Sequence, residues 1–339
     1  MTERAAAITT FLRGAGWGAA SHAPLAGDAS NRRYLRLTGG PGGAGAVLMD
    51  APPETGEDVR PFTTIAQHLH ALHLSAPAIL AEDPVQGFVL LEDLGDALFA
   101  RVTAQSPEME APLYAAATDL LVQLHRADPP ADLATYDAPL MANLACLPFQ
   151  WYLPALDQAA PENDVKTFQA ELETLLTRHA PPSVLILRDY HAENLIWLPD
   201  RNGIARVGLL DFQDAMIGHP AYDLVSLLED ARRDVPLAIQ RRMRDRYAAA
   251  TGAVPDAFGL AFALLGAQRN LRILGVFARL CVRDGKPGYL PMLPRVWGHL
   301  MHDLSHPELA GLRARVDRLL PPPTPERCQR IAQRCTPRP

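Results

Sequence analysis

Two carboxylates and one amide in the middle of the chain stand beside short apolar runs. These polar residues are Asp189, Asn194 and Asp211. The apolar runs next to them, each typical of a short buried strand, are 184–187, 195–198 and 205–210. A sheet holds polar groups at its strand ends in fixed positions while a ligand can still reach them. The sequence therefore predicts a functional site on a small β insertion.

These residue types fit the transfer of a phosphoryl group. The reaction needs metal ions on the phosphate oxygens and a carboxylate aligned with the acceptor hydroxyl. Mg²⁺ takes one or two carboxylate or amide oxygens from a protein, so Asn194 and Asp211 are the predicted metal ligands. Asp189, five residues before Asn194, is the predicted catalytic residue. Strand-end carboxylates that only cap turns are the alternative, but the order of these motifs favours a kinase-like site.

The expected elements change character near residue 92. Before it, strand-like segments dominate, at 33–37, 46–49, 78–81 and 87–91, beside helical spacing near the N-terminus and over 59–74. After it, helical spacing prevails, over 113–125, 165–178, 222–231 and 258–282. We therefore predict an α+β chain in four parts. These are a β-rich nucleotide-binding lobe (1–91), a hinge (92–95), a helical catalytic and substrate lobe (96–320) and a Pro-rich basic tail (321–339), the last expected to be a solvated terminus.

Composition and charge exclude several classes of protein. The 339 residues are 48% apolar and 21% charged, which excludes disorder, coiled coil and collagen. A net charge of −6 provides no basic field for nucleic acid. Four scattered cysteines without a C-x-x-C pair indicate a reducing compartment. Since no uninterrupted apolar run approaches the length of a membrane span, we expect a cytoplasmic monomer without nucleic-acid or membrane partners.

The motifs around the three polar residues resemble those of a known family. The segments 187–194 (Leu-Arg-Asp-Tyr-His-Ala-Glu-Asn), 209–214 (Leu-Leu-Asp-Phe-Gln-Asp) and 218–224 (Gly-His-Pro-Ala-Tyr-Asp-Leu) are similar to the catalytic region of the aminoglycoside phosphotransferase and choline kinase superfamily, relatives of protein kinases. The resemblance covers most of the chain. It implies a two-lobed protein-kinase-like fold, the use of ATP with Mg²⁺, and a role for Asp223 in supporting the catalytic loop.

By the same resemblance, segment 27–34 is similar to the phosphate-binding loop and segment 88–95 to the hinge. The cofactor-binding residues that it implies are Ser30, Asn31, Arg32, Arg33, Glu92 and Leu94. Two features of the family are missing. Leu187 stands where the family usually has His, and segment 47–50 lacks the usual phosphate-binding Lys, just as the following helix lacks its Glu partner. Another cation must then hold the phosphates, and the nearest candidates in sequence are Arg32, Arg33 and Arg60.

Within the superfamily, one subgroup is the most similar. Segments 47–54, 188–190, 211–215 and 268–280 look most like those of the N-acetylmuramate/N-acetylglucosamine anomeric kinases of cell-wall recycling. The resemblance implies that the anomeric hydroxyl of an amino sugar receives the phosphate. The candidate substrate residues are His191, Trp151, Arg269 and Asn270. The alternatives for His191 are a second base, a residue that shapes the loop, or no role. Trp151 has a core position as its alternative, and Arg269 and Asn270 have buried polar anchors.

Two other functions stay open from the sequence alone. A kinase of an aminoglycoside or amino alcohol would need clustered acids for its cationic acceptor, whereas segment 268–283 is rich in arginine. A nucleotide-binding pseudokinase would explain the missing Lys and His. The presence of Asp189, Asn194 and Asp211 argues against that second alternative.

Overall fold

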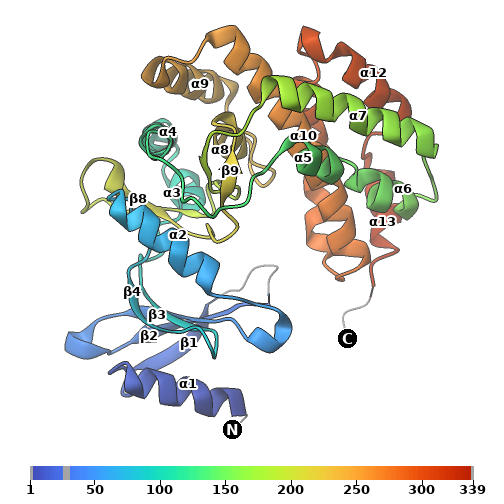
Figure 1. Ribbon diagram of the computed structural model, residues 1–339. Helices are drawn as coiled ribbons and strands as arrows, with labels where there is room; N and C mark the ends of the chain where they lie inside the picture. Colours follow the sequence, from blue (N-terminus) through green and yellow to red (C-terminus); the bar gives the residue numbers. More distant parts are fainter. Residues whose placement is uncertain (1–2, 26–30, 337–339) are drawn as a thin grey trace. The chain divides into compact units, whose positions relative to one another are not determined.

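The computed structural model describes residues 3–25 and 31–336, which form two compact units. The first unit contains residues up to 120 and the segment 192–215, and the second contains residues 121–191 and 216 onward. Helices and an antiparallel sheet occur together (Figure 1), so the predicted α+β class is confirmed.

A five-stranded antiparallel sheet forms the centre of the first unit. Its strands are β1 (Ser21–Leu25), β2 (Arg33–Thr38), β3 (Ala46–Asp50), β4 (Ile79–Asp83) and β5 (Phe88–Glu92), in the order β1-β2-β3-β5-β4. The sequence did not predict β1. This strand contains a proline and is largely exposed. An edge strand tolerates both features, but they leave no alternation of apolar and polar residues from which a strand can be predicted.

Helices cover both faces of this sheet (Figure 1). On one face, α1 (Glu3–Gly14) buries Leu12 against a cluster that includes Trp17, Leu48 and Phe88. On the other, α2 (Arg60–Ala71) buries residues spaced three and four apart, at 62, 65, 66 and 69. Side chains of a strand alternate between faces, so Leu48 faces α1 and its neighbour Val47 faces the opposite side.

Two short strand pairs make up the β insertion. β7 (Leu195–Trp197) pairs with β8 (Val207–Leu209) in the first unit, and β6 (Val184–Ile186) pairs with β9 (Met216–Gly218) in the second. The predicted strand at 205–210 is shorter in the structure, because a 3₁₀ turn occupies Gly203–Arg206. β9 was not predicted, since three residues are too few to establish an alternation.

The remaining elements are mostly helical. The first unit contains α3 (Phe99–Gln105), and α4 (Glu110–Leu124) runs into the second unit. The helices of the second unit are α5 (Ala138–Ala145), α6 (Leu153–Ala155), α7 (Glu162–His179), α8 (Ala221–Leu228), α9 (Leu237–Thr251), α10 (Pro255–Val282), α11 (Leu293–Asp303), α12 (Ala310–Leu319) and α13 (Pro325–Ala332).

The long helix α10 is the core of the second unit. Among the described helices, it alone has the length and apolar composition that a membrane span requires. However, 83% of its most apolar window is buried by the rest of the protein. Such burial is typical of a core helix, so the composition of α10 is weak evidence for a membrane span.

The tail after residue 320 is folded, which corrects the prediction of a solvated terminus. The Tyr152 hydroxyl donates to the Pro321 carbonyl at 2.9 Å, and α13 buries Ile331 completely. Cys335 forms a disulfide with Cys281 of α10, a pair that the cysteine spacing does not predict and that contradicts the expectation of four reduced cysteines. The Pro-rich composition identified a helix stop correctly. It carried no information on whether the apolar residue beyond that stop finds a partner.

Candidate active site

Asn194 and Asp211 lie together at one end of the β7–β8 ladder. Leu195 pairs with Leu209, so the residues just outside this pair, Asn194 and Leu210, face each other. The Leu210 N–H donates to the Asn194 carbonyl at 2.9 Å, and Asn194 Nδ2 lies 3.4 Å from Asp211 Oδ2. The strand register therefore makes the two predicted metal ligands neighbours.

The backbone of Asp211 adopts the left-handed conformation, with φ of 58°. Apart from Gly, Asp and Asn tolerate this region best, and such strain concentrates at functional sites. Gln213 Nε2 donates to Asp211 Oδ1 at 2.6 Å. The next residue, Phe212, is buried and stacks on Phe62 of α2 with ring centroids 4.7 Å apart. The aromatic stack thus anchors the turn that carries the Asp211 carboxylate.

These donors fit a hard divalent cation. A carboxylate and an amide oxygen are a small protein contribution, and Mg²⁺ typically takes its other ligands from water and phosphate. No cluster of three or more His, Cys, Asp or Glu residues forms a metal cage within residues 3–25 and 31–336. A phosphate-bound magnesium ion does not require such a cage.

A cavity of about 400 Å³ opens beside this pair, and all of its lining belongs to the first unit. The volume is typical of a small-molecule or cofactor site. The lining includes the predicted cofactor-binding residues Glu92 and Leu94 as well as the predicted metal ligands Asn194 and Asp211. The structure therefore brings four predicted site residues, from two distant segments, to one cavity.

Strand β2 contributes two further residues to the cavity wall, Tyr34 and Arg36. The pKa of Tyr34 is raised to about 12, chiefly by burial; Arg32 opposes this shift and the Asp211 carboxylate contributes to it. Arg32, two residues before Tyr34, continues the alternation toward the cavity. Its Nε donates to Glu57 at 2.8 Å, and Asp214 of the cavity wall interacts with it electrostatically. Arg32 does not itself line the cavity, but its charge acts on Asp214 of the cavity wall.

The other two candidate cations are placed less favourably. Arg33 is exposed, and strand alternation directs its side chain to the face opposite Tyr34. Arg60 is exposed and pairs with Asp58 at 2.9 Å. The surroundings thus favour Arg32 among the three candidates.

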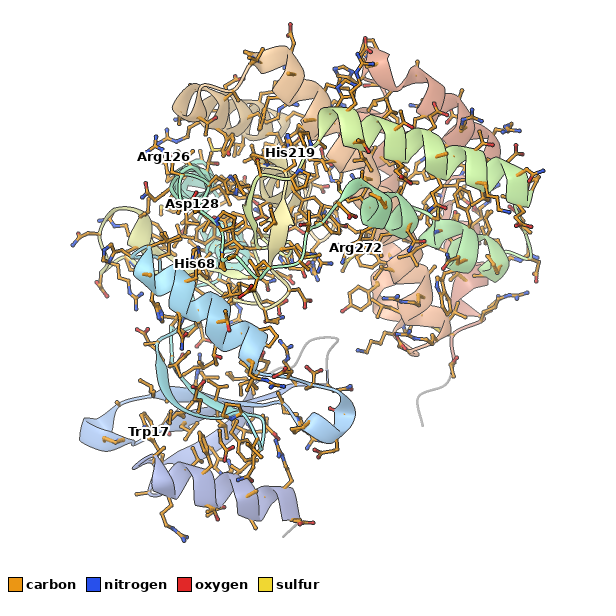
Figure 2. The ribbon with its side chains drawn as sticks, in the orientation of Figure 1. Trp17, His68, Arg126, Asp128, His219 and Arg272 are labelled. Atoms are coloured by element: carbon orange, nitrogen blue, oxygen red, sulfur yellow. A yellow bond between two sulfur atoms is a disulfide. The ribbon has the colours of Figure 1, made fainter. Side chains whose placement is uncertain are left out.

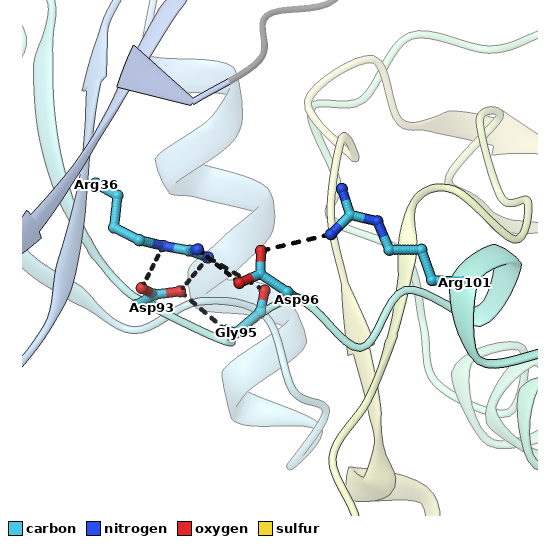
Figure 3. A network of polar contacts seen from close by, with 5 residues as sticks. All are labelled: Arg36, Asp93, Gly95, Asp96 and Arg101. Atoms are coloured by element: carbon cyan, nitrogen blue, oxygen red, sulfur yellow. Dashed lines mark hydrogen bonds and ion pairs between the residues drawn. The ribbon is translucent and has the colours of Figure 1, made fainter. Parts of the chain in front are cut away.

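Arg36 is a cavity residue that sequence reasoning missed. Figure 3 shows its guanidinium bound to the Asp93 and Asp96 carboxylates, each at 2.7 Å, and to the Gly95 carbonyl. It pairs across the sheet with Val47, in the segment that lacks the family's lysine. The signal that could have identified Arg36 is its spacing of two residues from Tyr34, which places both side chains on the same face of the strand. Because two carboxylates compensate its charge, Arg36 connects β2 to the segment after β5 and is a weaker candidate for phosphate binding than Arg32.

In the second unit, Asp223 of α8 holds the loop that carries Asp189. The Asp223 carboxylate is fully buried and accepts the backbone N–H groups of Leu187 and Arg188 at 2.6 and 2.8 Å. Burial raises the pKa of Asp223 to about 7 although these two bonds oppose the shift. Ser226 adds a hydrogen bond from Oγ to the Arg188 carbonyl at 3.3 Å. The backbone directly before Asp189 is therefore fixed from α8.

His191, a predicted substrate residue, is almost completely buried, with 4% exposure. Burial, reinforced by Arg232 and Arg269, lowers the pKa of its imidazole well below the ordinary value. Its Nε2 lies 3.1 Å from Arg232 Nη1, so this nitrogen is the acceptor. A neutral imidazole bound to an arginine is suited to shaping the loop and poorly suited to accepting a proton from a substrate.

Arg269 and Asn270 are also buried, at 4% and 0% exposure. Arg269 donates to Ser226 Oγ at 2.9 Å and to the Glu229 carbonyl at 3.3 Å. Asn270 Nδ2 donates to the carboxylates of Glu229 and Asp303 at 2.9 and 3.2 Å. These contacts favour the anchor interpretation of the two that the sequence left open.

The remaining predicted site residues are scattered. Trp151 is half-buried in a π-helical turn at Pro148–Tyr152. The Asn31 N–H points to Glu57 Oε1 at 3.3 Å, and Glu92 accepts a hydrogen bond from Arg201 at 2.5 Å. Ser30 lies outside the described residues.

The Glu229–Asp303 pair below α10 gives the protein a pH-dependent stability. Both carboxyls are fully buried, and burial raises the pKa of each, that of Glu229 from 4.5 to about 7. The folded protein then binds protons that the unfolded chain releases. This stabilisation is complete below the unfolded-state pKa and is lost as pH rises through about 7. We expect the contribution of this pair to the free energy of unfolding to fall by on the order of 2–3 kcal/mol between pH 4.5 and 8.

Denaturant titrations at several pH values measure this slope. Asp303→Asn should remove much of the pair's contribution to the wild-type slope, because the amide needs no proton, whereas Asp317→Asn at the exposed ion pair with Arg313 should leave the slope unchanged. Equal slopes in the wild-type protein and the Asp303 variant would contradict the prediction.

Together, the sheet with its cofactor-sized cavity, the Asn194–Asp211 pair and the loop supported by Asp223 define a kinase-like phosphotransferase. Residues 21–262 match the phosphotransferase enzyme family, and the chain belongs to this family. It is a small-molecule kinase, as predicted.

Individual relatives agree with this assignment. The chain is 40% identical to the N-acetylmuramate/N-acetylglucosamine kinase of Caulobacter vibrioides, over 94% of this chain and 98% of the relative. It is 35% identical to the kinase of the same description from Pseudomonas putida, over 90% and 91% of the two chains. These similarities confirm the resemblance seen in the sequence motifs.

A solved structure shares the fold. The aminoglycoside phosphotransferase APH(2'')-IIa, solved in a complex with streptomycin and ATP, aligns with a TM-score of 0.58 at 13% identity, over 89% of this chain and 96% of that chain. At this identity the likeness establishes the fold alone. The predicted two-lobed protein-kinase-like fold is confirmed.

Proposed function

We propose that this kinase transfers the γ-phosphoryl group of ATP to the anomeric hydroxyl of N-acetylmuramate or N-acetylglucosamine. The observation that carries the proposal is similarity over nearly the whole length. Four kinases described as acting on these two sugars are 35–40% identical to the chain, over 85% or more of its residues. This extent of similarity includes residues of both units.

ATP would bind in the cavity of the first unit. Backbone groups of segment 92–95, the proposed hinge, would receive the adenine, and the loop that includes Ser30 and Asn31 would cover the phosphates. Asn194 and Asp211 would hold Mg²⁺, whose chemistry when bound is to neutralise charge on the phosphate oxygens. The lining of the cavity by Glu92, Leu94, Asn194 and Asp211 supports this assignment.

Asp189 would align the acceptor hydroxyl and accept its proton. An anomeric hydroxyl is more acidic than an ordinary alcohol, so a weak base such as a carboxylate is sufficient to accept its proton. Positioning accounts for most of catalysis in phosphoryl transfer. The two hydrogen bonds that Asp223 accepts from the backbone before Asp189 support this role, because they limit the freedom of the loop.

We also propose that the protein acts as a cytoplasmic monomer without nucleic-acid or membrane partners. The net charge of −6 supports the absence of a nucleic-acid partner, and the burial of α10 supports the absence of a membrane partner.

Phosphorus-coupled NMR of the product tests the acceptor atom. Purified protein with ATP and Mg²⁺ is incubated with N-acetylglucosamine, and the expected product shows coupling between phosphorus and H1 and has no free reducing end. Coupling to the C6 protons would refute the anomeric assignment but would still demonstrate kinase activity. Parallel reactions with an aminoglycoside and with choline test other acceptors, and turnover of one of these in place of either sugar would refute the proposed substrate class.

Neutralising Arg32 should weaken ATP binding. Arg32 provides a charge near Asp211 and Asp214, where the phosphates would lie, and charge-assisted hydrogen bonds are strong. We expect Arg32→Ala to raise the Kd for MgATP by about tenfold or more while sugar affinity stays constant. Calorimetry measures both affinities.

The exposed Arg13 of α1 provides a matched control, since Arg13→Ala removes the same charge from a helix on the sheet face opposite the cavity. Thermal unfolding of both variants checks that the fold is intact. An unchanged Kd in Arg32→Ala would assign phosphate binding to another cation.

A further inference from the structure

An arginine of α10 contacts α8 next to Asp223, the residue that holds the catalytic loop. Arg272 of α10, labelled in Figure 2, donates from Nη1 to the Tyr222 hydroxyl at 3.2 Å. The next residue along α8 is Asp223, whose carboxylate holds the backbone of Leu187 and Arg188. Adjacent residues of one short helix therefore contact Arg272 and the loop that ends in Asp189.

An aromatic pair fixes this arrangement. The rings of Tyr222 and Tyr136 pack edge to face with centroids 5.1 Å apart, and both side chains are almost fully buried. The Arg188 guanidinium lies 5.2 Å from the centre of the Tyr136 ring, within the range of a cation–π interaction. Two guanidinium groups, those of Arg188 and Arg272, thus contact the same rigid pair.

Arg272 is charged and lies within electrostatic reach of Asp189. Burial opposes its charged form, but the Tyr222 and Tyr136 hydroxyls and the Asp189 carboxylate raise the pKa of its guanidinium above the ordinary value. The side chain is half-buried, so water does not fully screen its charge.

Arg272 also has hydrogen-bonding capacity to spare. A guanidinium carries five N–H donors, and the bond to Tyr222 uses one of them. Within the part of the chain that the structure describes, no carboxylate forms an ion pair with Arg272. Two arginines on either side of it differ: Arg269 donates to Ser226 and the Glu229 backbone, and Arg283 pairs with Asp284 at 2.7 Å.

We propose that Arg272 determines specificity among the sugars by binding the carboxylate of N-acetylmuramate. The two proposed substrates differ in one group: N-acetylmuramate carries a lactyl ether that ends in a carboxylate, and N-acetylglucosamine has a hydroxyl there. A planar guanidinium with spare donors binds a carboxylate through two parallel hydrogen bonds, which lysine cannot reproduce. The inference rests on the proposed function. It names the residue of the acceptor site that recognises the lactyl carboxylate of the sugar.

The ratio of kcat/KM for the two sugars tests the inference. We expect Arg272→Gln to lower kcat/KM for N-acetylmuramate about tenfold or more relative to that for N-acetylglucosamine, chiefly through KM. Arg272→Lys should give an intermediate ratio, because it keeps the charge and loses the bidentate geometry. Arg283→Gln, at the C-terminal cap of the same helix and paired with Asp284, should leave the ratio unchanged.

Activity on N-acetylglucosamine serves as the internal control for folding. An equal loss for both sugars would assign Arg272 a structural role and overturn the inference, as would an unchanged ratio in a variant that is active on both. If the wild-type protein phosphorylates neither sugar, the proposed function is wrong and the inference falls with it.

Discussion

Replacing Asp189 by Asn is expected to lower kcat at least about 10²-fold and to leave the Kd for MgATP unchanged. Asparagine keeps the size of the side chain but cannot accept the proton of the acceptor hydroxyl. The support of the loop should survive, because Asp223 binds the backbone of Leu187 and Arg188 and not the Asp189 side chain. ATP binding should survive because the lining of the cavity belongs to the first unit, whereas Asp189 belongs to the second.

Steady-state kinetics at saturating ATP and calorimetry with MgATP separate the two effects. A matched control is Asp317→Asn, which makes the same chemical change at an exposed ion pair. Near-normal turnover of the best sugar by the Asp189 variant would show that another group aligns the hydroxyl.

Replacing Asp211 by Asn is expected to have the larger effect, a loss of about 10³-fold or more in kcat/KM, because it removes the only charged member of the proposed metal pair. The backbone should tolerate the change, since asparagine accepts the positive φ of 58° at this position. The amide would place an N–H group near the donors Gln213 Nε2 and Asn194 Nδ2, where two acceptor oxygens stood before. Repulsion between donors would further weaken cation binding.

The measurement compares ATP binding with and without Mg²⁺. In the wild-type protein Mg²⁺ should strengthen ATP binding, and in the Asp211 variant this dependence should largely disappear. Asp58→Asn, at an exposed pair in the same unit, controls for the loss of one negative charge. Retained dependence on Mg²⁺ together with retained activity would show that Asp211 is not the metal ligand.

Much of the chemistry could be predicted because it resides in short contiguous motifs. Asp189, Asn194 and Asp211 flank apolar runs whose lengths indicate strands, and the register of a short antiparallel ladder then leaves Asn194 and Asp211 side by side. Strong periodicity likewise predicted α2, α10 and most of the central sheet. The family followed from the same motifs, since each requires particular residue types at fixed spacing.

Tertiary structure decided what depends on register and packing between distant segments. Arg36 reaches the cavity because β2 pairs with β3, and its charge is compensated by Asp93 and Asp96 beyond β5. Burial alone distinguishes Arg269, an internal anchor, from Arg272, a half-buried cation three residues later on the same apolar helix.

By itself, then, the sequence determined the reaction class, the α+β architecture and the residues that carry the motifs. Only the tertiary structure decided which arginines face the cavity or the catalytic loop, that the tail folds onto α10, and that Tyr222 connects Arg272 to the Asp189 loop. The physical reason is that spacing along the chain specifies local conformation and the buried face of an element. The partner that each face meets depends on contacts between residues tens of positions apart, and periodicity carries no information about these contacts.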